Sequence, residues 1–225
     1  MSNTKHIAIL LSGNGSHLQN FIDHYADDDT VCIDVVISNE PSAYGLKRAH
    51  NAGIPTLVIN HRDYVQREAF DAALVDALRP FNLDVVILAG FMRILTPVFV
   101  EEFKGHLFNI HPSLLPKYPG LHTHRRAIEA GDAYAGASVH FVTEELDGGP
   151  VVAQIKEAIN INDTEQTLAS RVIIKEHALY PLTIQWFLDG QLHLRGNDAY
   201  VNSEKLPPTL GGSPRWPPVG RGLGQ

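Results

Sequence analysis

Three polar side chains in this chain have the types and the spacing that proton transfer at a reacting carbon requires. Asn109 and His111 are separated by one residue at the end of an apolar run, and Asp147 lies further along in a Leu-Asp-Gly-Gly-Pro sequence. If the run is a strand, successive side chains alternate between its faces, so Asn109 and His111 leave the same face. Pro112 removes a backbone donor and biases His111 toward an extended conformation, which predicts that the strand ends there.

These groups supply complementary chemistry. An asparagine N–H can stabilise a developing oxyanion, a histidine can transfer a proton near neutral pH, and an aspartate can orient the imidazole and favour its protonated form. The set includes no serine or cysteine nucleophile, so we expect the substrate to bring its own nucleophile. Acyl or formyl transfer to an amine fits this chemistry best.

Length and composition indicate an ordinary globular protein. The chain has 225 residues, of which 44% are hydrophobic, enough for one large α/β domain or two very small ones. The formal net charge of -7 makes a nucleic-acid surface unexpected, so an anionic ligand must be held by local cations and backbone amides. The single cysteine, Cys32, lies in an apolar run, and we expect it to be buried in a reducing compartment.

The sequence also predicts a location. The first residues have no apolar signal core, and no stretch is long enough to cross a membrane. We therefore expect a soluble, cytoplasmic protein that binds no membrane.

Strand-like and helix-like segments alternate along the chain, which predicts parallel strands joined by helical crossovers. We expect strands over residues 7–11, 31–38, 56–59, 84–89, 106–111 and 137–142, followed by an extended or antiparallel segment over 151–161. We expect helices that start near 16, 43, 63, 97 and 163, with a long ordered loop over 111–122. The predicted class is α/β: a mostly parallel twisted sheet with helices on both faces and an antiparallel addition toward the C-terminus.

Helix starts and stops refine this prediction. Ser16 and Asp63 each precede a Gln three residues later, which favours capping boxes at two helices, and Asp163 or Thr164 opens the longest one. Pro181 inside that last helix predicts a kink or break near Tyr180. We expect residues 1–208 to form one domain, and the Gly/Pro-rich tail 209–225 to be disordered.

The sequence Ser-Gly-Asn-Gly-Ser over residues 12–16 joins the first predicted strand to the first helix. Small residues there let backbone N–H groups and the helix dipole approach an anion. The loop is not the dinucleotide fingerprint, because Leu18 stands where the third glycine belongs. The loop is therefore equally compatible with a phosphate site and with a plain tight turn.

Longer motifs identify a family. Residues 109–120 (Asn-Ile-His-Pro-Ser-Leu-Leu-Pro-Lys-Tyr-Pro-Gly) and 138–150, with the stretch 88–95 and the Gln-Trp-Phe sequence at 185–187, resemble the phosphoribosylglycinamide formyltransferase family. The resemblance runs from about Ile7 to about Pro208. It implies a Rossmann-like formyltransferase fold and a one-carbon transferase of purine biosynthesis. Such an enzyme moves the formyl group of its co-substrate, 10-formyltetrahydrofolate, to the amine of 5-phosphoribosylglycinamide (glycinamide ribonucleotide), releasing tetrahydrofolate.

The resemblance also implies roles for individual residues. Asn109, His111 and Asp147 are the implied catalytic residues. Glycinamide ribonucleotide is implied to bind at Gly15, Ser16, His17, Ile173, Ile174, Lys175 and Glu176. The folate is implied to bind at Arg67, Met92, Arg93, Ile94, Leu95, Asn109, Thr143, Glu144, Glu145, Leu146 and Asp147, with Arg67 near its glutamate tail.

His17 departs from the family pattern, which has Asn at this position. Backbone contacts to a phosphate survive that change, and we hypothesise that the imidazole adds a pH-dependent attraction for the phosphate.

Plainer interpretations exist for several of these residues. Arg67 and Arg93 are also compatible with ordinary solvated charges, and Glu176 with a surface carboxylate. His122 and His124 resemble a metal-ligand pair, but no third ligand stands at a recognisable spacing, so we expect no metal. His140 lies in a predicted strand, where a packed side chain is expected.

Alternative functions remain. Another formyltetrahydrofolate enzyme, a hydrolase, uses the same chemistry, but those hydrolases carry an additional N-terminal domain, and methionyl-tRNA formyltransferases an additional C-terminal one. We expect no room for either in 225 residues. A non-catalytic nucleotide-binding module is the alternative from another class. The expected partners are small-molecule substrates, without nucleic acid, and the oligomeric state is expected to be monomer or homodimer.

Overall fold

The computed structural model describes residues 4–207, which form two compact units. The first unit runs to Asn109 and includes Val142–Glu144, and the second consists of Ile110–Phe141 and the chain from Glu145 onward. Within the described residues, no helix combines the length and the apolar character that a membrane crossing requires.

The first unit is an alternation of strands and helices. Its strands are β1 (Lys5–Leu11), β2 (Val31–Ser38), β3 (Thr56–Val58), β4 (Val85–Leu88) and β5 (Leu107–His111), whose last two residues belong to the second unit. Its helices are α1 (Ser16–His24), α2 (Tyr44–Asn51), the short 3-10 helix η1 (His61–Asp63), α3 (Arg67–Leu78) and α4 (Pro97–Glu102).

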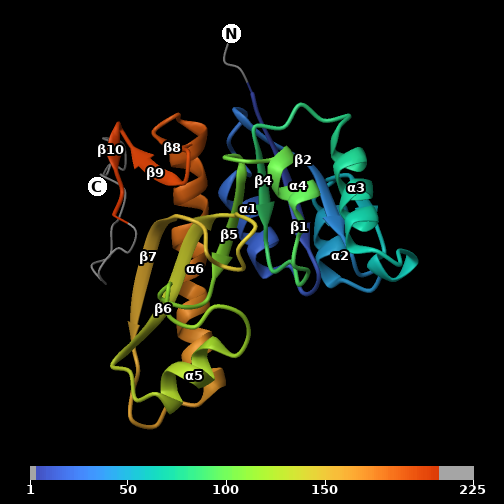
Figure 1. Ribbon diagram of the computed structural model, residues 1–225. Coiled ribbons are helices and arrows are strands. Elements are labelled where there is room, and N and C mark those ends of the chain that lie inside the picture. Colours follow the sequence, from blue (N-terminus) through green and yellow to red (C-terminus); the bar gives the residue numbers. More distant parts are fainter. Residues whose placement is uncertain (1–3, 208–225) are drawn as a thin grey trace. The chain divides into compact units, whose positions relative to one another are not determined.

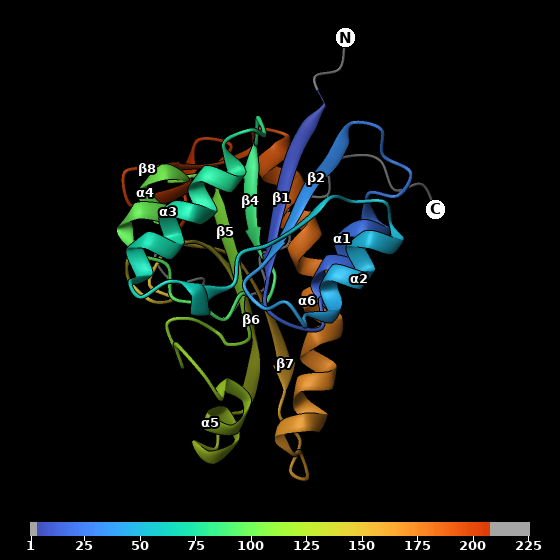
Figure 2. The same cartoon turned by 90° about the vertical axis from the view of Figure 1, so that its right-hand side faces the viewer.

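Strands β1 to β5 pair in parallel, and helices cover both faces of this part of the sheet. Figure 2 shows α1 and α2 together on one side of β1 and β2, and α3 and α4 on the other. Strand β1 is buried on both faces over its last five residues, as its continuous apolar run predicts. One core cluster joins β1, β2 and β4 to α3 and α4 through side chains that include Leu10, Ile37, Leu74, Val86 and Phe99.

The second unit contains α5 (Thr123–Glu129), β6 (Tyr134–Phe141), β7 (Val151–Ala158), α6 (Glu165–Leu188), β8 (Leu192–Arg195), β9 (Asp198–Val201) and β10 (Glu204–Lys205). Strands β6 and β7 are antiparallel, and Figure 1 shows the long helix α6 beside them. Strands β8, β9 and β10 form a small antiparallel sheet of their own.

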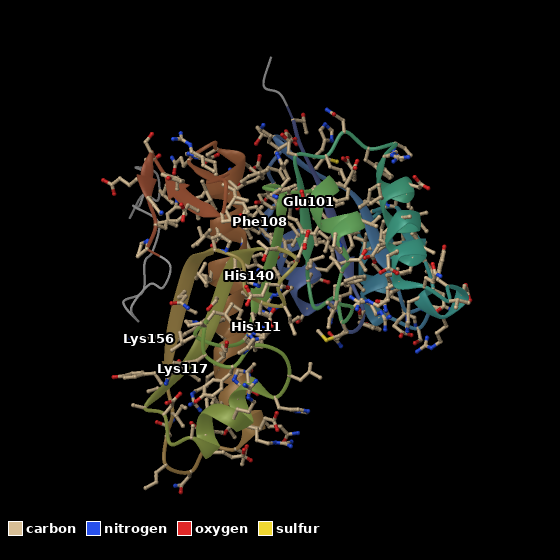
Figure 3. All side chains as sticks on the ribbon, in the orientation of Figure 1. Glu101, Phe108, His111, Lys117, His140 and Lys156 are labelled. Atoms are coloured by element: carbon tan, nitrogen blue, oxygen red, sulfur yellow. The ribbon has the colours of Figure 1, made fainter. Side chains whose placement is uncertain are left out.

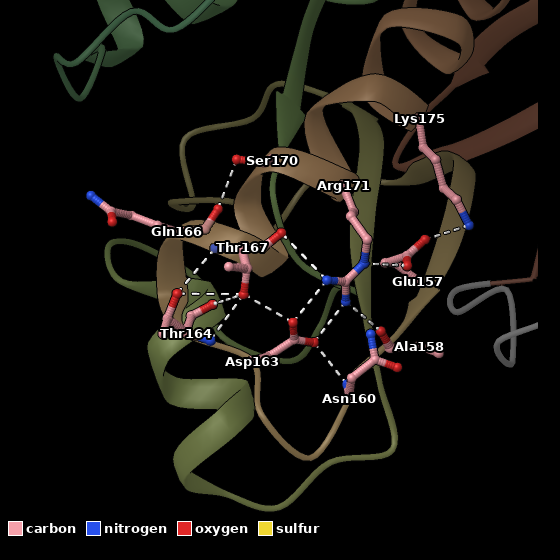
Figure 4. A network of polar contacts seen from close by, with 10 residues as sticks. All are labelled: Glu157, Ala158, Asn160, Asp163, Thr164, Gln166, Thr167, Ser170, Arg171 and Lys175. Carbon is pink, nitrogen blue, oxygen red and sulfur yellow. Dashed lines mark hydrogen bonds and ion pairs between the residues drawn. The ribbon is translucent and has the colours of Figure 1, made fainter.

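The start of α6 is fixed by a polar network (Figure 4). The Thr164 hydroxyl accepts a hydrogen bond from the Thr167 backbone N–H at 3.2 Å, and the Thr167 hydroxyl accepts one from the Thr164 backbone N–H. Arg171, one turn further on, donates to both oxygens of Asp163 and to Glu157 in β7. Hydrogen bonds from Arg171 hold the pKa of Asp163 well below its usual range, so this network stays charged at neutral pH.

The predicted fold class is confirmed. The strands follow the order β3-β2-β1-β4-β5-β6-β7 in a mostly parallel sheet, with an antiparallel addition toward the C-terminus. The predicted helices and strands are present within a few residues of the expected bounds, and residues 112–122 form the expected loop. The prediction for the tail 209–225 lies outside the described residues, and the single domain over 1–208 stays a prediction.

Four local predictions are wrong. Cys32 is exposed, because it lies at the start of β2 opposite His6, before the part of the strand that the helices cover. Neither Ser16 nor Asp63 caps its helix: α1 begins after Gly15, and residues 61–63 form η1. The break expected near Tyr180 is absent: helix α6 is continuous through Pro181, whose side chain is buried, so packing of the helix offsets the cost of the proline. A kink at this point stays a prediction.

Helix α5 and strands β8 to β10 have no capping or periodicity signal in the sequence. Helix α5 begins after His122, whose backbone is left-handed and whose side chain makes no capping bond. Strands β8 to β10 have four residues or fewer, which is too short for a period to be recognised.

Two glycines allow the loop after β1 to touch α2. Gly15 has a left-handed backbone (φ 74°), and a Cβ atom built on it would lie 2.6 Å from the Cα atom of Gly45. The Gly45 backbone N–H donates to the Gly13 carbonyl at 3.0 Å, which holds the two segments together. No residue with a side chain fits Gly15 without moving one of these backbones.

We predict that Gly15→Ala lowers the free energy of unfolding by about 2 to 4 kcal/mol, since it combines left-handed strain with a backbone clash. Gly53→Ala is the matched control, because Gly53 is also left-handed (φ 72°) but has open space around its Cβ position. Its cost should be only about 1 kcal/mol. Urea denaturation measures both, and equal costs for the two variants would contradict the close approach.

Candidate active site

The second unit contains a buried imidazole–carboxylate pair. His111 is the last residue of β5, and its Nδ1 atom lies 3.4 Å from Oδ2 of Asp147. The two side chains are only 7% and 9% exposed. Asp147 has a left-handed backbone (φ 51°), which aspartate tolerates better than most residues. The predicted partnership between these two residues is therefore present in the structure.

The loop after β5 contacts both members of the pair. The Nε2 atom of His111 lies 2.9 Å from the Tyr118 carbonyl oxygen, and the Gly120 backbone N–H donates to Oδ2 of Asp147 at 2.8 Å. A carbonyl oxygen can only accept, so Nε2 of His111 carries a proton in this arrangement. The imidazole therefore presents an N–H on one side and faces a carboxylate on the other.

A second histidine, His140 in β6, lies on the other oxygen of Asp147. Its Nε2 atom is 3.8 Å from Oδ1 of Asp147, and its Nδ1–H donates to the Phe141 carbonyl at 2.9 Å. Burial lowers the pKa of His140 to about 4, so the ring is neutral at neutral pH. Figure 3 shows His111 and His140 close to one another. His140 is packed, as its strand position predicts, and its neutral ring lies beside the Asp147 carboxylate.

Further titratable groups gather in the same unit. Glu176 on α6 is buried, only 4% exposed, so its interpretation as a surface carboxylate is wrong. Burial lowers the pKa of His124 on α5, and Glu176 opposes that shift, which indicates that the two groups sense each other. The Nδ1 atom of His124 is buried without a hydrogen-bond partner among the described residues.

His124 was singled out from the sequence only as a possible metal ligand. His122 instead lies beside Glu165, with 3.8 Å between Nδ1 and Oε1. Within residues 4–207, histidine, cysteine and carboxylate side chains form no group of three able to hold a metal. Sequence reasoning also missed Tyr118, whose contribution is a backbone carbonyl and carries no residue-type signal.

In the first unit, the predicted phosphate loop leads directly into helix α1. Gly15 caps α1, Ser16 is its first residue, and His17 follows with 8% exposure. Arg48 donates to the backbone oxygen of Asn14 at 2.9 Å and to its side-chain oxygen at 3.0 Å, which fixes the loop. Free N–H groups at the start of a helix are a general anion site.

The predicted folate segment lies after β4. Leu95 is buried, whereas Met92 and Ile94 are 65% and 52% exposed. Arg93, with Met92, lines a pocket of about 730 Å³. Arg67 donates to the Ile94 carbonyl at 2.5 Å, so its guanidinium contacts this segment directly.

The remaining predicted residues differ in exposure. Glu144, Glu145 and Leu146 are exposed, and Thr143 is half-buried. On α6, Ile174 is 69% exposed and Ile173 is half-buried. The Lys175 side chain contacts β7: its Nζ atom lies 2.7 Å from Oε2 of Glu157 and donates to the Lys156 carbonyl. Asn109 is a half-buried residue of β5.

Comparison with known proteins places this chain in a class. A family model described as formyl transferase matches residues 5–184. A phosphoribosylglycinamide formyltransferase of Escherichia coli is 50% identical over 203 residues, which cover 90% of this chain and 96% of that protein. A Coxiella burnetii structure of the same name has a TM-score of 0.87 at 42% identity, covering 91% of this chain and 97% of that one.

A longer relative matches as well. The human trifunctional purine biosynthetic protein adenosine-3 is 43% identical over 192 residues, which cover 85% of this chain and 19% of that protein. The chain belongs to the formyl transferase family. Its resemblance to the phosphoribosylglycinamide formyltransferases within that family is confirmed.

The buried neutral His140 predicts acid sensitivity. Its pKa of about 4 in the folded state lies below the value of about 6.5 expected in the unfolded chain. The unfolded chain therefore takes up this proton first, so the free energy of unfolding falls as the pH drops from about 6.5 to about 4. His140→Gln removes the titrating group and should show a shallower loss over this range.

Urea denaturation at several pH values between these limits measures the effect. The control is His50→Gln, because His50 is exposed on α2. Parallel pH curves for the parent and His140→Gln would contradict a buried neutral imidazole.

Proposed function

We propose that this chain transfers the formyl group of 10-formyltetrahydrofolate to the amine of glycinamide ribonucleotide. The observation that carries the proposal is the buried contact of 3.4 Å between His111 and Asp147 in a chain 50% identical to a phosphoribosylglycinamide formyltransferase. The products are formylglycinamide ribonucleotide and tetrahydrofolate. Residues 1–208 are taken as the formyltransferase domain.

The proposed reaction is a direct attack. The neutral amine of the ribonucleotide forms a bond to the formyl carbon, and the carbonyl electrons move to oxygen. Collapse of the tetrahedral intermediate breaks the bond between the formyl carbon and N10 of the folate. The attacking nitrogen loses a proton and N10 gains one, so the reaction needs proton traffic and no oxidant or reductant.

Three residues are proposed to serve these steps. Asn109 donates a hydrogen bond to the developing oxyanion. His111 moves the proton and stabilises charge, and its Nε2–H becomes available when it leaves the Tyr118 carbonyl. Asp147 orients the imidazole through Nδ1, and the Gly120 N–H holds that carboxylate in place.

The substrates are proposed to use the parts of the fold described above. The N–H groups at the start of α1, from Gly15 to His17, receive the phosphate, which suits a chain whose net charge gives an anion no general attraction. Residues 173–176 of α6 contact the ribonucleotide, with Glu176 as the buried carboxylate among them. The folate lies along Met92–Leu95 and residues 143–147, with Arg67 near its glutamate tail.

The proposal also covers metal dependence, cellular location and oligomeric state. The side chains and the two organic substrates account for every bond change, so no step is assigned to a metal. A cytoplasmic location and a monomeric or homodimeric state stay predictions.

An assay of folate product with and without glycinamide ribonucleotide tests the function. Turnover only with the acceptor supports the transferase, turnover without it supports a hydrolase, and none in either case supports a binding module. In the same assay, Asn109→Ala should lower kcat by about 100- to 1000-fold while changing KM much less, because an oxyanion donor acts in the transition state. A variant kcat within a few fold of the parent would remove Asn109 from the mechanism.

A further inference from the structure

Side chains from two other parts of the first unit hold the segment between β4 and α4. Residues 92–96 have no helical or strand structure. The Met92 backbone N–H donates to the Ser12 hydroxyl at 2.7 Å, and the Thr96 N–H donates to the Asp71 carboxylate at 2.5 Å. Between them, the Ile94 carbonyl accepts from Arg67. The shape of this segment is therefore set by side chains far away in the sequence.

Ser12 is itself held by a second side chain. Its hydroxyl donates to Oδ1 of Asn39, with 2.6 Å between the oxygens. Asn39 follows β2, is only 2% exposed, and has its Nδ2 atom 3.1 Å from Nδ1 of His61. The amide oxygen of Asn39 faces Ser12 and its nitrogen faces Nδ1 of His61, an atom that also lies 3.1 Å from the Asn39 backbone oxygen.

The hydrogen bond to Asn39 sets the direction of the Ser12 hydroxyl proton, and so determines whether Ser12 can accept from the Met92 N–H. A hydroxyl has one proton and two acceptor positions. Because Asn39 takes the proton, a lone pair of the Ser12 oxygen is left facing the Met92 N–H. Without Asn39 the hydroxyl can rotate, and its proton then competes for that position.

We propose that Ser12 and Asn39 are positioning residues for the formyl folate, acting by fixing the Met92 N–H and the backbone that follows it. The inference rests on the proposed function, because it takes Met92–Leu95 as the folate segment. Ser12 contacts the segment rather than the reacting atoms.

Because Met92 is exposed, its hydrogen bond to Ser12 should matter for the position of the Met92 N–H and little for the stability of the fold. The Met92 residue is 65% exposed, and Ser12 and Met92 both line the pocket of about 730 Å³. Solvent can therefore replace the lost hydrogen bond when Ser12 is removed, so the folded state loses little. The position of the Met92 N–H is lost all the same.

Kinetics of variants test the proposal. Ser12→Ala should raise the KM for 10-formyltetrahydrofolate by about three- to tenfold, the worth of one hydrogen bond, while the KM for glycinamide ribonucleotide changes by less than about twofold. Asn39→Ala should act in the same direction. The double variant should be no worse than the more affected single variant, because the two residues act through one bond.

Three further variants sharpen the result. Ser12→Thr keeps the hydroxyl and should restore the parent KM for the folate. Ser12→Cys nearly keeps the side-chain volume and weakens the hydrogen bonds, and it provides the test if the alanine variant does not fold. Ser42→Ala is the matched control, because Ser42 lines the same pocket but lies outside this chain of bonds. It should leave both KM values unchanged.

The difference between the effects on the two KM values, for the folate and for glycinamide ribonucleotide, decides the outcome. An unchanged KM for the folate in Ser12→Ala and Ser12→Cys would overturn the proposal, and so would an equal rise in both KM values or the same rise in Ser42→Ala. Activity of the parent enzyme separates the proposed function from the positioning role. An inactive parent removes the proposed function, whereas an active parent with unaffected variants removes only the positioning role.

Discussion

The burial of one carboxylate beside one imidazole is the constraint on which this site depends. The side chains of Asp147 and His111 are each less than a tenth exposed, and a charged group at that depth is costly unless partners replace its water. The structure supplies those partners from the backbone and side chains of one unit: the Gly120 N–H and the His111 ring face the carboxylate, and His140 stays neutral beside it. Asp147 itself has a left-handed backbone, within a turn in which the Gly148 N–H donates to the Glu145 carbonyl.

The first unit contributes through the ends of its strands. Strands β1, β2, β4 and β5 are parallel, so the segments that follow them leave one edge of the sheet. Ser12 follows β1, Asn39 follows β2 and Met92 follows β4, and their hydrogen bonds connect these ends. The buried strands thus give fixed starting points to segments that have no regular structure of their own.

Much of this could be predicted from the sequence where a single local rule decides. The buried run of β1, the alternation of strands and helices, and Asn109 and His111 one residue apart at the end of β5 follow from periodicity and proline chemistry. Contacts made by backbone atoms of an irregular loop could not be predicted, because a carbonyl carries no residue-type signal, and for this reason the Tyr118 carbonyl on His111 was missed. Cys32 was expected to be buried because its run is apolar, but burial depends on where helices cover a strand, and a local pattern does not contain that information.

Replacement of Asp147 by its uncharged isostere tests the central claim most directly. Asp147→Asn keeps the size of the side chain and an oxygen for the Gly120 N–H, but removes the charge that faces His111. The measurement is kcat for formyl transfer at saturating substrates, with thermal unfolding as a check on the fold. The account predicts a folded variant whose kcat falls by about 100-fold or more, since the imidazole loses the group that orients it for proton transfer. A folded variant that keeps kcat within about threefold of the parent would contradict it.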